Sequence, residues 1–206
     1  MIRIILTLSL AWILLAGCSR SPRVTYYTLN ATAAAEPATQ AMEPVVIGAV
    51  TLPDLLDRPH FVVTVDANRV DILELHRWAA PLKSEIQRII ADNLRMLLKP
   101  TRVAVNTQNT VIGAVYQIQI DVQRFEMIEG KEVVVDLLWS IRCSDGTASK
   151  YGHTVVREPA TSFGYEFLAA AQSRALAAVT LDISKALRGM ASTDKLLETP
   201  HNTKLR

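Results

Sequence analysis

The stretch YQIQIDVQRF, Tyr116–Phe125, alternates apolar and polar side chains from Tyr116 to Gln123. A period of two residues is typical of a β-strand that buries one face and leaves the other in water. The alternation slips at Arg124-Phe125, which predicts a β-bulge or the end of the strand. We therefore expect a half-buried strand here, and the pattern on either side of it gives the rest of the fold.

Downstream, the sequence predicts two more strands that follow the first in an antiparallel meander. Glu129-Gly130 has the composition of a turn, and Lys131–Cys143 forms a long second strand. Ser144-Asp145-Gly146 is typical of a hairpin turn, and Lys150–Arg157 supplies the third strand.

Upstream, shorter segments rich in β-branched and aromatic residues also predict strands. Asp66-Ala67-Asn68 is the tight connection of one hairpin, and residues 31–44 are a loop because they lack periodicity. The predicted strands are Val24–Asn30, Val45–Leu52, Phe61–Val65, Arg69–Leu75 and Arg102–Asn106.

Two segments change to a helical period. Ala80–Leu98 is an amphipathic helix with Pro81 in its first turn, and Gly164–Leu187 is a second helix whose alanines permit close packing on a sheet. Residues 190–206 are polar and aperiodic, which predicts a disordered tail. The predicted fold class is α+β: two layers, with both helices on one face of a mixed, largely antiparallel sheet.

The first residues have the pattern of a secretory signal peptide, residues 1–17, with one charge at Arg3 and a short apolar segment. Leu15-Ala16-Gly17-Cys18 resembles the lipobox of bacterial lipoproteins, in which the cysteine receives the lipid and becomes the first mature residue. The alternative is an ordinary leader that contains a cysteine. In the lipobox interpretation, residues 18–23 are the lipidated Cys18 with a short tether, and the domain spans residues 24–189.

Ser19 follows the lipid cysteine. Serine there resembles the lipoproteins sorted to the outer membrane, which implies a lipid-anchored protein at its periplasmic face. If Cys18 carries lipid, Cys143 has no partner within the chain, and its place on an apolar strand face predicts a small buried side chain. A net charge of +2 gives no strong field for nucleic acid.

The sequence offers no catalytic motif, cofactor loop or set of metal ligands. Glu74 and His76 share a strand face, but a third ligand is not evident, so a solvated face is the simpler interpretation. His60 lies in a loop, His201 lies in the tail, and His153 is expected to be a partly buried pairing residue. Asp54 and Asp57 are explained by turn formation.

Ordered landmarks along the chain resemble the ABC-type transport auxiliary lipoproteins, the PqiC group. They are the lipobox with Ser19, Tyr26–Leu29, LPDLLDRPHFV, LHRWAAPL entering a helix, VVVDLLWS, and the helix that starts at Gly164-Tyr165. The resemblance implies a subunit that is not an enzyme and has no cofactor beyond its covalent lipid. It implies as partners an MCE-domain protein and an inner-membrane transporter component, in lipid transport that supports envelope integrity.

Arg77 and Trp78 are candidates for a partner surface. The alternative places Trp78 in the core, because a large aromatic beside an amphipathic helix usually buries itself. The resemblance leaves the oligomeric state open, a homo-oligomer included. A second hypothesis for the whole chain is a free-standing envelope ligand-binding module or hydrolase, which would need a deep pocket with convergent polar groups.

Overall fold

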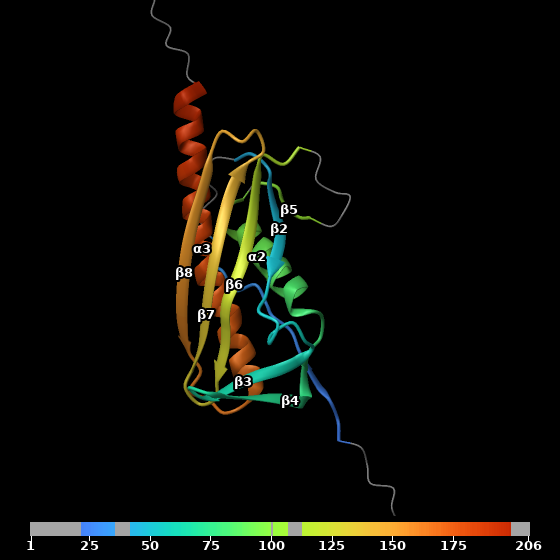
Figure 1. The fold of residues 1–206 in the computed structure, drawn as a ribbon. Helices are drawn as coiled ribbons and strands as arrows, with labels where there is room; N and C mark the ends of the chain where they lie inside the picture. Colours follow the sequence, from blue (N-terminus) through green and yellow to red (C-terminus); the bar gives the residue numbers. More distant parts are fainter. Residues whose placement is uncertain (1–21, 36–41, 100, 107–112, 199–206) are drawn as a thin grey trace, which may run out of the picture.

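The computed structural model describes residues 22–35, 42–99, 101–106 and 113–198, and its largest element is a five-stranded sheet (Figure 1). Three of its strands form the predicted antiparallel meander, and β2 pairs in parallel with β5 and β6. The strand order is β5 (Val103–Val105), β2 (Val45–Thr51), β6 (Tyr116–Ile128), β7 (Glu132–Cys143) and β8 (Ser149–Pro159). The register between β6 and β7 shifts between Val122 and Arg124, which confirms the predicted bulge.

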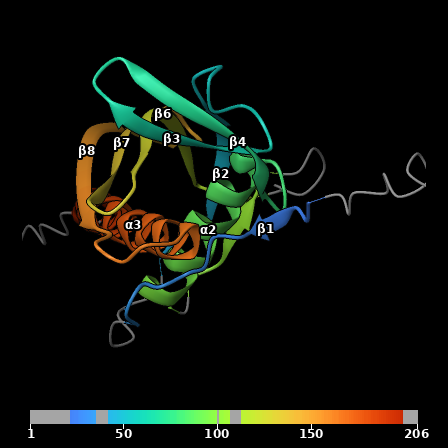
Figure 2. The same cartoon turned by 90° about the horizontal axis from the view of Figure 1, so that it is seen from below.

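Both helices cover the same face of this sheet, α2 (Leu82–Leu97) beside β2 and α3 (Tyr165–Glu198) beside β7 and β8 (Figure 2). The α+β fold class is therefore confirmed. Alanines on the inner side of α3, such as Ala171 and Ala175, are fully buried, so this helix lies close to the strands. Across from it, Gly152 leaves room for the indole ring of Trp139, which a Cβ at that position would overlap.

The second helix is longer than its apolar stripe predicts. It continues beyond the expected end at Leu187 as far as Glu198, so residues 190–198 differ from the predicted tail, and 199–206 lie outside the described residues. Extending an existing helix costs little compared with starting one, and the segment after Gly189 contains helix formers. The hydroxyls of Ser192 and Thr193 also donate to carbonyl oxygens one turn earlier.

The remaining strands form a separate three-stranded sheet, where the sequence patterns predicted a single sheet. Its order is β1 (Thr25–Tyr27), β4 (Arg69–Trp78) and β3 (His60–Asp66), with β1 parallel to β4 and β3 antiparallel to it. The sheet lies at the lower end of the molecule in Figure 1, next to the start of α3. The prolines at 53 and 59 bracket the connection from β2 and separate β3 from the larger sheet.

Phe61 on β3 is the centre of the contact between the two sheets. Its side chain is fully buried, and its ring centroid lies 4.6 Å from that of Tyr27 on β1 and 4.4 Å from that of Trp78 on β4. Tyr165, at the start of α3, meets Phe61 edge-on at 6.4 Å, and Phe125 of β6 lies 6.5 Å from Trp78. These five rings join the small sheet, the large sheet and α3 in one apolar cluster, which we call the aromatic cluster.

Phe61→Ala should lower the free energy of unfolding by about 3–5 kcal/mol, the usual cost of removing a buried phenylalanine ring. Chemical denaturation followed by circular dichroism measures this change. Phe163→Ala is the matched control, because Phe163 is 82% exposed and should shift stability by no more than about 0.5 kcal/mol. Equal losses in the two variants would contradict the central place of Phe61.

Candidate functional site

Two predicted site residues, Cys18 and Ser19, lie outside the described residues, and so does His201. The lipid anchor and the sorting signal therefore stay predictions. The description starts at residue 22, and β1 follows almost at once, at Thr25. Of the helices that the structure describes, neither combines the length and apolar composition that a membrane crossing needs.

The segment after β1 is bound tightly to α2 through one carboxylate. Glu85 Oε2 accepts a hydrogen bond from the Thr28 hydroxyl at 2.8 Å and another from the Leu29 N–H at 3.1 Å. Arg88 donates to the same Oε2 at 2.9 Å and to the Leu29 carbonyl at 3.0 Å. Burial alone would raise the pKa of Glu85, but the hydrogen bonds from Arg88, Thr28 and Leu29 outweigh it and lower the pKa.

Further along, the same segment is held by both helices. The side-chain oxygen of Asn93 accepts the N–H groups of Thr32 and Ala33, each at 3.0 Å. On α3, Ser173 Oγ accepts the N–H of Asn30 at 3.1 Å. The segment after β1 is thus bound to both helices and is part of the domain.

A surface hollow of about 280 Å³ lies where two of the landmark segments meet. One wall comes from the connection between β2 and β3, and the other from the end of β4 and the entry into α2. The lining residues are Asp57, Arg58, Pro59, Trp78, Ala79, Ala80, Pro81 and Leu82. Lys83 Nζ holds the Asp57 carboxylate at 2.6 Å and so fixes the first wall to the helix. The fold therefore brings together LPDLLDRPHFV and LHRWAAPL, which are separate in the sequence.

Of the two residues proposed for a partner surface, Trp78 is only 4% exposed and belongs to the aromatic cluster. This agrees with the core interpretation of Trp78. Arg77 is half-buried, and its Nε donates to the Glu74 carbonyl at 3.1 Å. Arg77 pairs with Tyr26 of β1 and His60 of β3, so it lies on the outer face of the small sheet.

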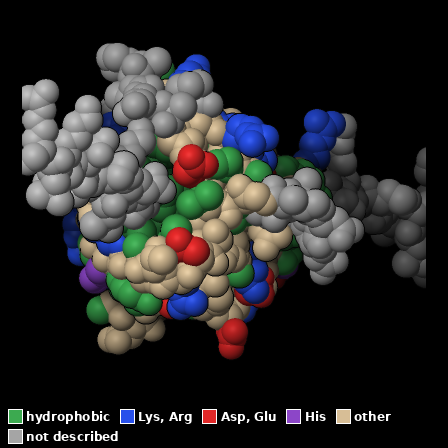
Figure 3. All heavy atoms as spheres, turned by 90° about the horizontal axis from the view of Figure 1, so that it is seen from above, with side chains coloured by type: hydrophobic (Ala, Val, Ile, Leu, Met, Phe, Trp, Pro, Cys, Tyr) green, Lys and Arg blue, Asp and Glu red, His purple; other side chains and the backbone are tan. Residues whose placement is uncertain are grey.

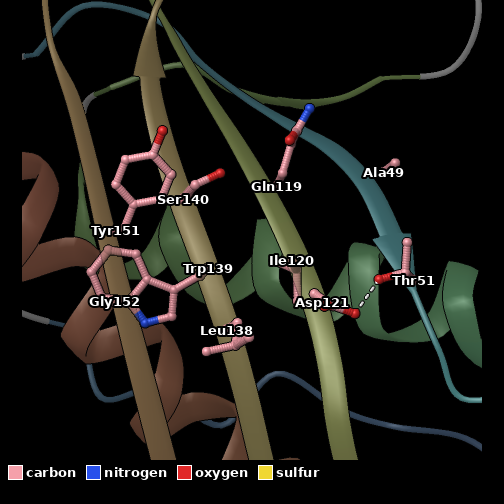
Figure 4. Close-up of a pocket in the computed structure, with 10 residues that line it drawn as sticks. All are labelled: Ala49, Thr51, Gln119, Ile120, Asp121, Leu138, Trp139, Ser140, Tyr151 and Gly152. Atoms are coloured by element: carbon pink, nitrogen blue, oxygen red, sulfur yellow. Dashed lines mark hydrogen bonds between the residues drawn. The ribbon is translucent and has the colours of Figure 1, made fainter.

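A larger hollow of about 480 Å³ lies on the face of the five-stranded sheet that is turned away from the helices (Figure 4). Tyr151 and Leu138 stand at its edge and are 68% and 41% exposed. The Thr51 hydroxyl donates to Asp121, and the side-chain amide of Gln123 donates to the other oxygen of this carboxylate at 2.9 Å. Among its lining residues are also Ala49, Gln119 and Ser140.

On the same outer face, the Asp136 carboxylate lies between the side chains of His153 and Arg124. His153 Nε2 lies 2.7 Å from Asp136 Oδ1, and Arg124 Nε donates to Oδ2 at 3.1 Å. Burial opposes ionisation of Asp136, but the bonds to His153 and Arg124 prevail and lower its pKa. His153 does pair, as predicted, but its side chain is 56% exposed, so the expected partial burial is wrong. The residues two positions before and after it on β8, Tyr151 and Val155, are exposed as well.

The other candidate residues, Glu74, His60, His76 and Cys143, make local contacts or are buried. The expectation that His60 lies in a loop is wrong, because it is the first residue of β3, and its Nε2 lies 3.4 Å from Glu74 Oε2. His76 Nδ1 is hydrogen-bonded to the Tyr27 hydroxyl at 2.8 Å. Within the described ranges, no group of three or more His, Cys, Asp or Glu side chains could hold a metal ion. Cys143 is 7% exposed at the edge of the core, and burial raises the pKa of its thiol, which fits the predicted buried side chain.

Sequence reasoning missed Glu85, although a signal was present. Glu85 lies one turn after Leu82 and next to Ile86, on the apolar stripe of its helix. A charged residue in such a stripe needs a buried partner. Arg88 on the same helix is one partner, and Thr28 and Leu29 are partners that only the tertiary fold brings close.

Glu85→Gln should destabilise the protein by about 1–3 kcal/mol at pH 7, because it weakens hydrogen bonds to a charged acceptor. The lowered pKa means that the carboxylate stabilises the fold above its ordinary pKa of about 4.3 and loses this effect as the pH falls through the folded value. The difference from wild type should therefore shrink on acidification. Unfolding curves from pH 7 down to pH 3 measure this, with the exposed Glu43→Gln as control. A difference that stays constant over the whole range would contradict the role of the charge.

Comparisons with known proteins give one matching family model and solved structures of similar fold. A search of curated proteins gives no match. A solved structure of an uncharacterized protein superposes with a TM-score of 0.66 at 18% identity, over 81% of this chain and 99% of the other. The solved structure of a Xanthomonas campestris protein of family DUF330 superposes with a TM-score of 0.70 at 18% identity, over 84% of this chain and 99% of the other. The family model for the ABC-type transport auxiliary lipoprotein component matches residues 27–184. The chain belongs to this family of transport-associated lipoproteins.

Proposed function

We propose that this protein is a lipid-anchored subunit of an MCE-type intermembrane lipid transport system. It faces the periplasm, holds or docks the conduit at the outer membrane, and supports envelope integrity. The observation that carries the proposal is the family match over residues 27–184, in a chain whose predicted lipobox is Leu15–Cys18. The family is one of transport auxiliary components and is not a known enzyme family.

The described geometry supports a docking role. The segment after the anchor is bound to both helices, through Glu85, Asn93 and Ser173, so the domain stays close to the membrane that holds the lipid. The hollow formed by the two landmark segments offers a partner an apolar floor beside charged groups at Asp57 and Arg58. Arg77 on the neighbouring sheet face extends this candidate docking surface.

The second hypothesis, a free-standing ligand-binding module or hydrolase, needs a deep pocket with convergent polar groups. Both hollows described above lie on the surface, one of about 480 Å³ and one of about 280 Å³. Neither gives this hypothesis a specific observation in its favour.

Cys18→Ala should abolish lipid attachment. Cells grown with an alkyne analogue of palmitate should label the wild-type chain and leave the Cys18→Ala chain unlabelled, because the thiol that accepts the lipid is gone. Cys143→Ala is the control, since Cys143 is buried in the folded domain and should leave the label unchanged. Label that persists in Cys18→Ala would show that the lipobox interpretation is wrong.

Affinity purification from crosslinked cells tests the partner. An MCE-domain protein and an inner-membrane transporter component should be enriched with the wild-type chain. Arg77→Glu should reduce this enrichment, because it reverses a charge on the candidate docking surface. Arg142→Glu, at an exposed position on β7, is the matched control. A wild-type pull-down without any MCE-domain protein would contradict the proposed function.

A further inference from the structure

Exposed apolar side chains gather at one end of the molecule. On the hairpin of β3 and β4, Val65, Val70, Ile72 and Leu75 are 37–40% exposed. Tyr26, on the adjoining strand β1, is 61% exposed. Clusters of exposed apolar side chains often mark interaction surfaces. The end with the three-stranded sheet is therefore a candidate for contact with an apolar or amphipathic partner.

The register of the hairpin explains why these side chains stay uncovered. Phe61 and its cross-strand partner Leu73 lie on the inner face, in contact with the core. Val62 pairs with Ile72, and Thr64 pairs with Val70, so these residues share the opposite face, on which Val62 is buried while Val70 and Ile72 are exposed. That face is apolar and β-branched, whereas Tyr165 of α3 packs on Phe61 and His76 of the small sheet. Figure 2 shows the hairpin of β3 and β4 on the other side of the molecule from most of α2 and α3.

The start of α3 adds two aromatic side chains to this end. Phe163 is 82% exposed and lies beside the turn between β6 and β7, near Gly130. Phe167, in the first turn of α3, is 44% exposed. Tyr165 between them packs inward on Phe61 and His76, which places the start of α3 against the small sheet. We call the exposed set Tyr26, Val65, Val70, Ile72, Leu75, Phe163 and Phe167 the apolar end.

The length of the tether decides which end can reach the membrane. From Cys18 to Thr25 the extended chain spans at most about 25 Å. The helix α3 has 34 residues and is about 50 Å long, and it starts at the apolar end. An anchor at Cys18 therefore keeps the apolar end near the lipid and the opposite end outside its reach. That opposite end presents basic and acidic side chains interspersed with apolar ones (Figure 3).

We propose that the apolar end rests on the lipid surface that holds Cys18, as a second, non-covalent membrane contact. The inference rests on the proposed anchoring of Cys18 and adds an orientation: the large sheet and the helices extend away from the membrane. Charges on the hairpin include the close pair Arg69 and Asp71, so the contact depends on apolar side chains more than on anionic lipid. The lipid on Cys18 raises the effective concentration of the apolar end at the membrane, so even a weak contact is enough to keep the apolar end on the lipid surface.

Tryptophan quenching by lipid tests this orientation. The processed, lipidated chain is reconstituted into phosphatidylethanolamine and phosphatidylglycerol vesicles whose acyl chains are brominated. Ile72→Trp places a reporter in the apolar end, and Val70→Trp repeats the measurement at a neighbouring position of the same face. Tyr151→Trp, on the outer face of the large sheet, is the matched control. The native Trp78 and Trp139 are buried, and the wild-type signal is subtracted as their background.

Ile72→Trp and Val70→Trp should lose emission in brominated vesicles and shift to the blue, while Tyr151→Trp should keep its emission. If all three variants keep the same fraction of their emission in brominated vesicles while the protein still floats with the vesicles, the orientation is overturned and the anchor stays intact. Failure to float would overturn the anchor and the orientation together. A blue shift of Ile72→Trp that grows with protein concentration without lipid would instead assign the face to a second copy of this chain.

Discussion

The burial of Phe61 is the contact on which the rest of the structure depends. The five-stranded sheet and its two helices already form a complete two-layer unit, and the small sheet has no backbone pairing with it. What holds the small sheet in place is the aromatic cluster, in which Phe61 contacts Tyr27, Trp78 and Tyr165. Such rings bury a large area and pack at defined angles, so they fix position as well as add stability.

The functional surfaces follow from this contact. Because Trp78 is drawn inward, the residues after it turn across the surface and meet the connection between β2 and β3, which creates the smaller hollow. Because β1 is paired with β4, the segment after it passes along α2 and meets Glu85. On the outer face of the hairpin, Val70 and Ile72 remain exposed. The candidate docking surface and the apolar end thus both lie at the small sheet, where Arg77 pairs with Tyr26.

Much of the fold could be predicted because its signals are local. The alternation from Tyr116 and its slip at Arg124 gave the meander and its bulge, and the change of period gave both helices. The split into two sheets could not be predicted in this way, since β1 and β4 pair across some fifty residues of chain, as Thr25 does with His76. The sequence pattern predicted that the second helix ends at Leu187, whereas α3 ends at Glu198. An apolar stripe shows only where a helix packs against the core, and a helix can continue beyond that contact.

For the candidate site, the sequence by itself determined the segments by which the family is recognised, and it predicts the leader and the lipobox. These are linear signals that a processing enzyme or a motif comparison reads without any fold. Only the tertiary structure decided that Trp78 is core, that Glu85 binds the segment after β1, and that two landmark segments share one hollow. The physical reason is that burial and pairing depend on which distant residues come together, and no single stretch of chain contains that information.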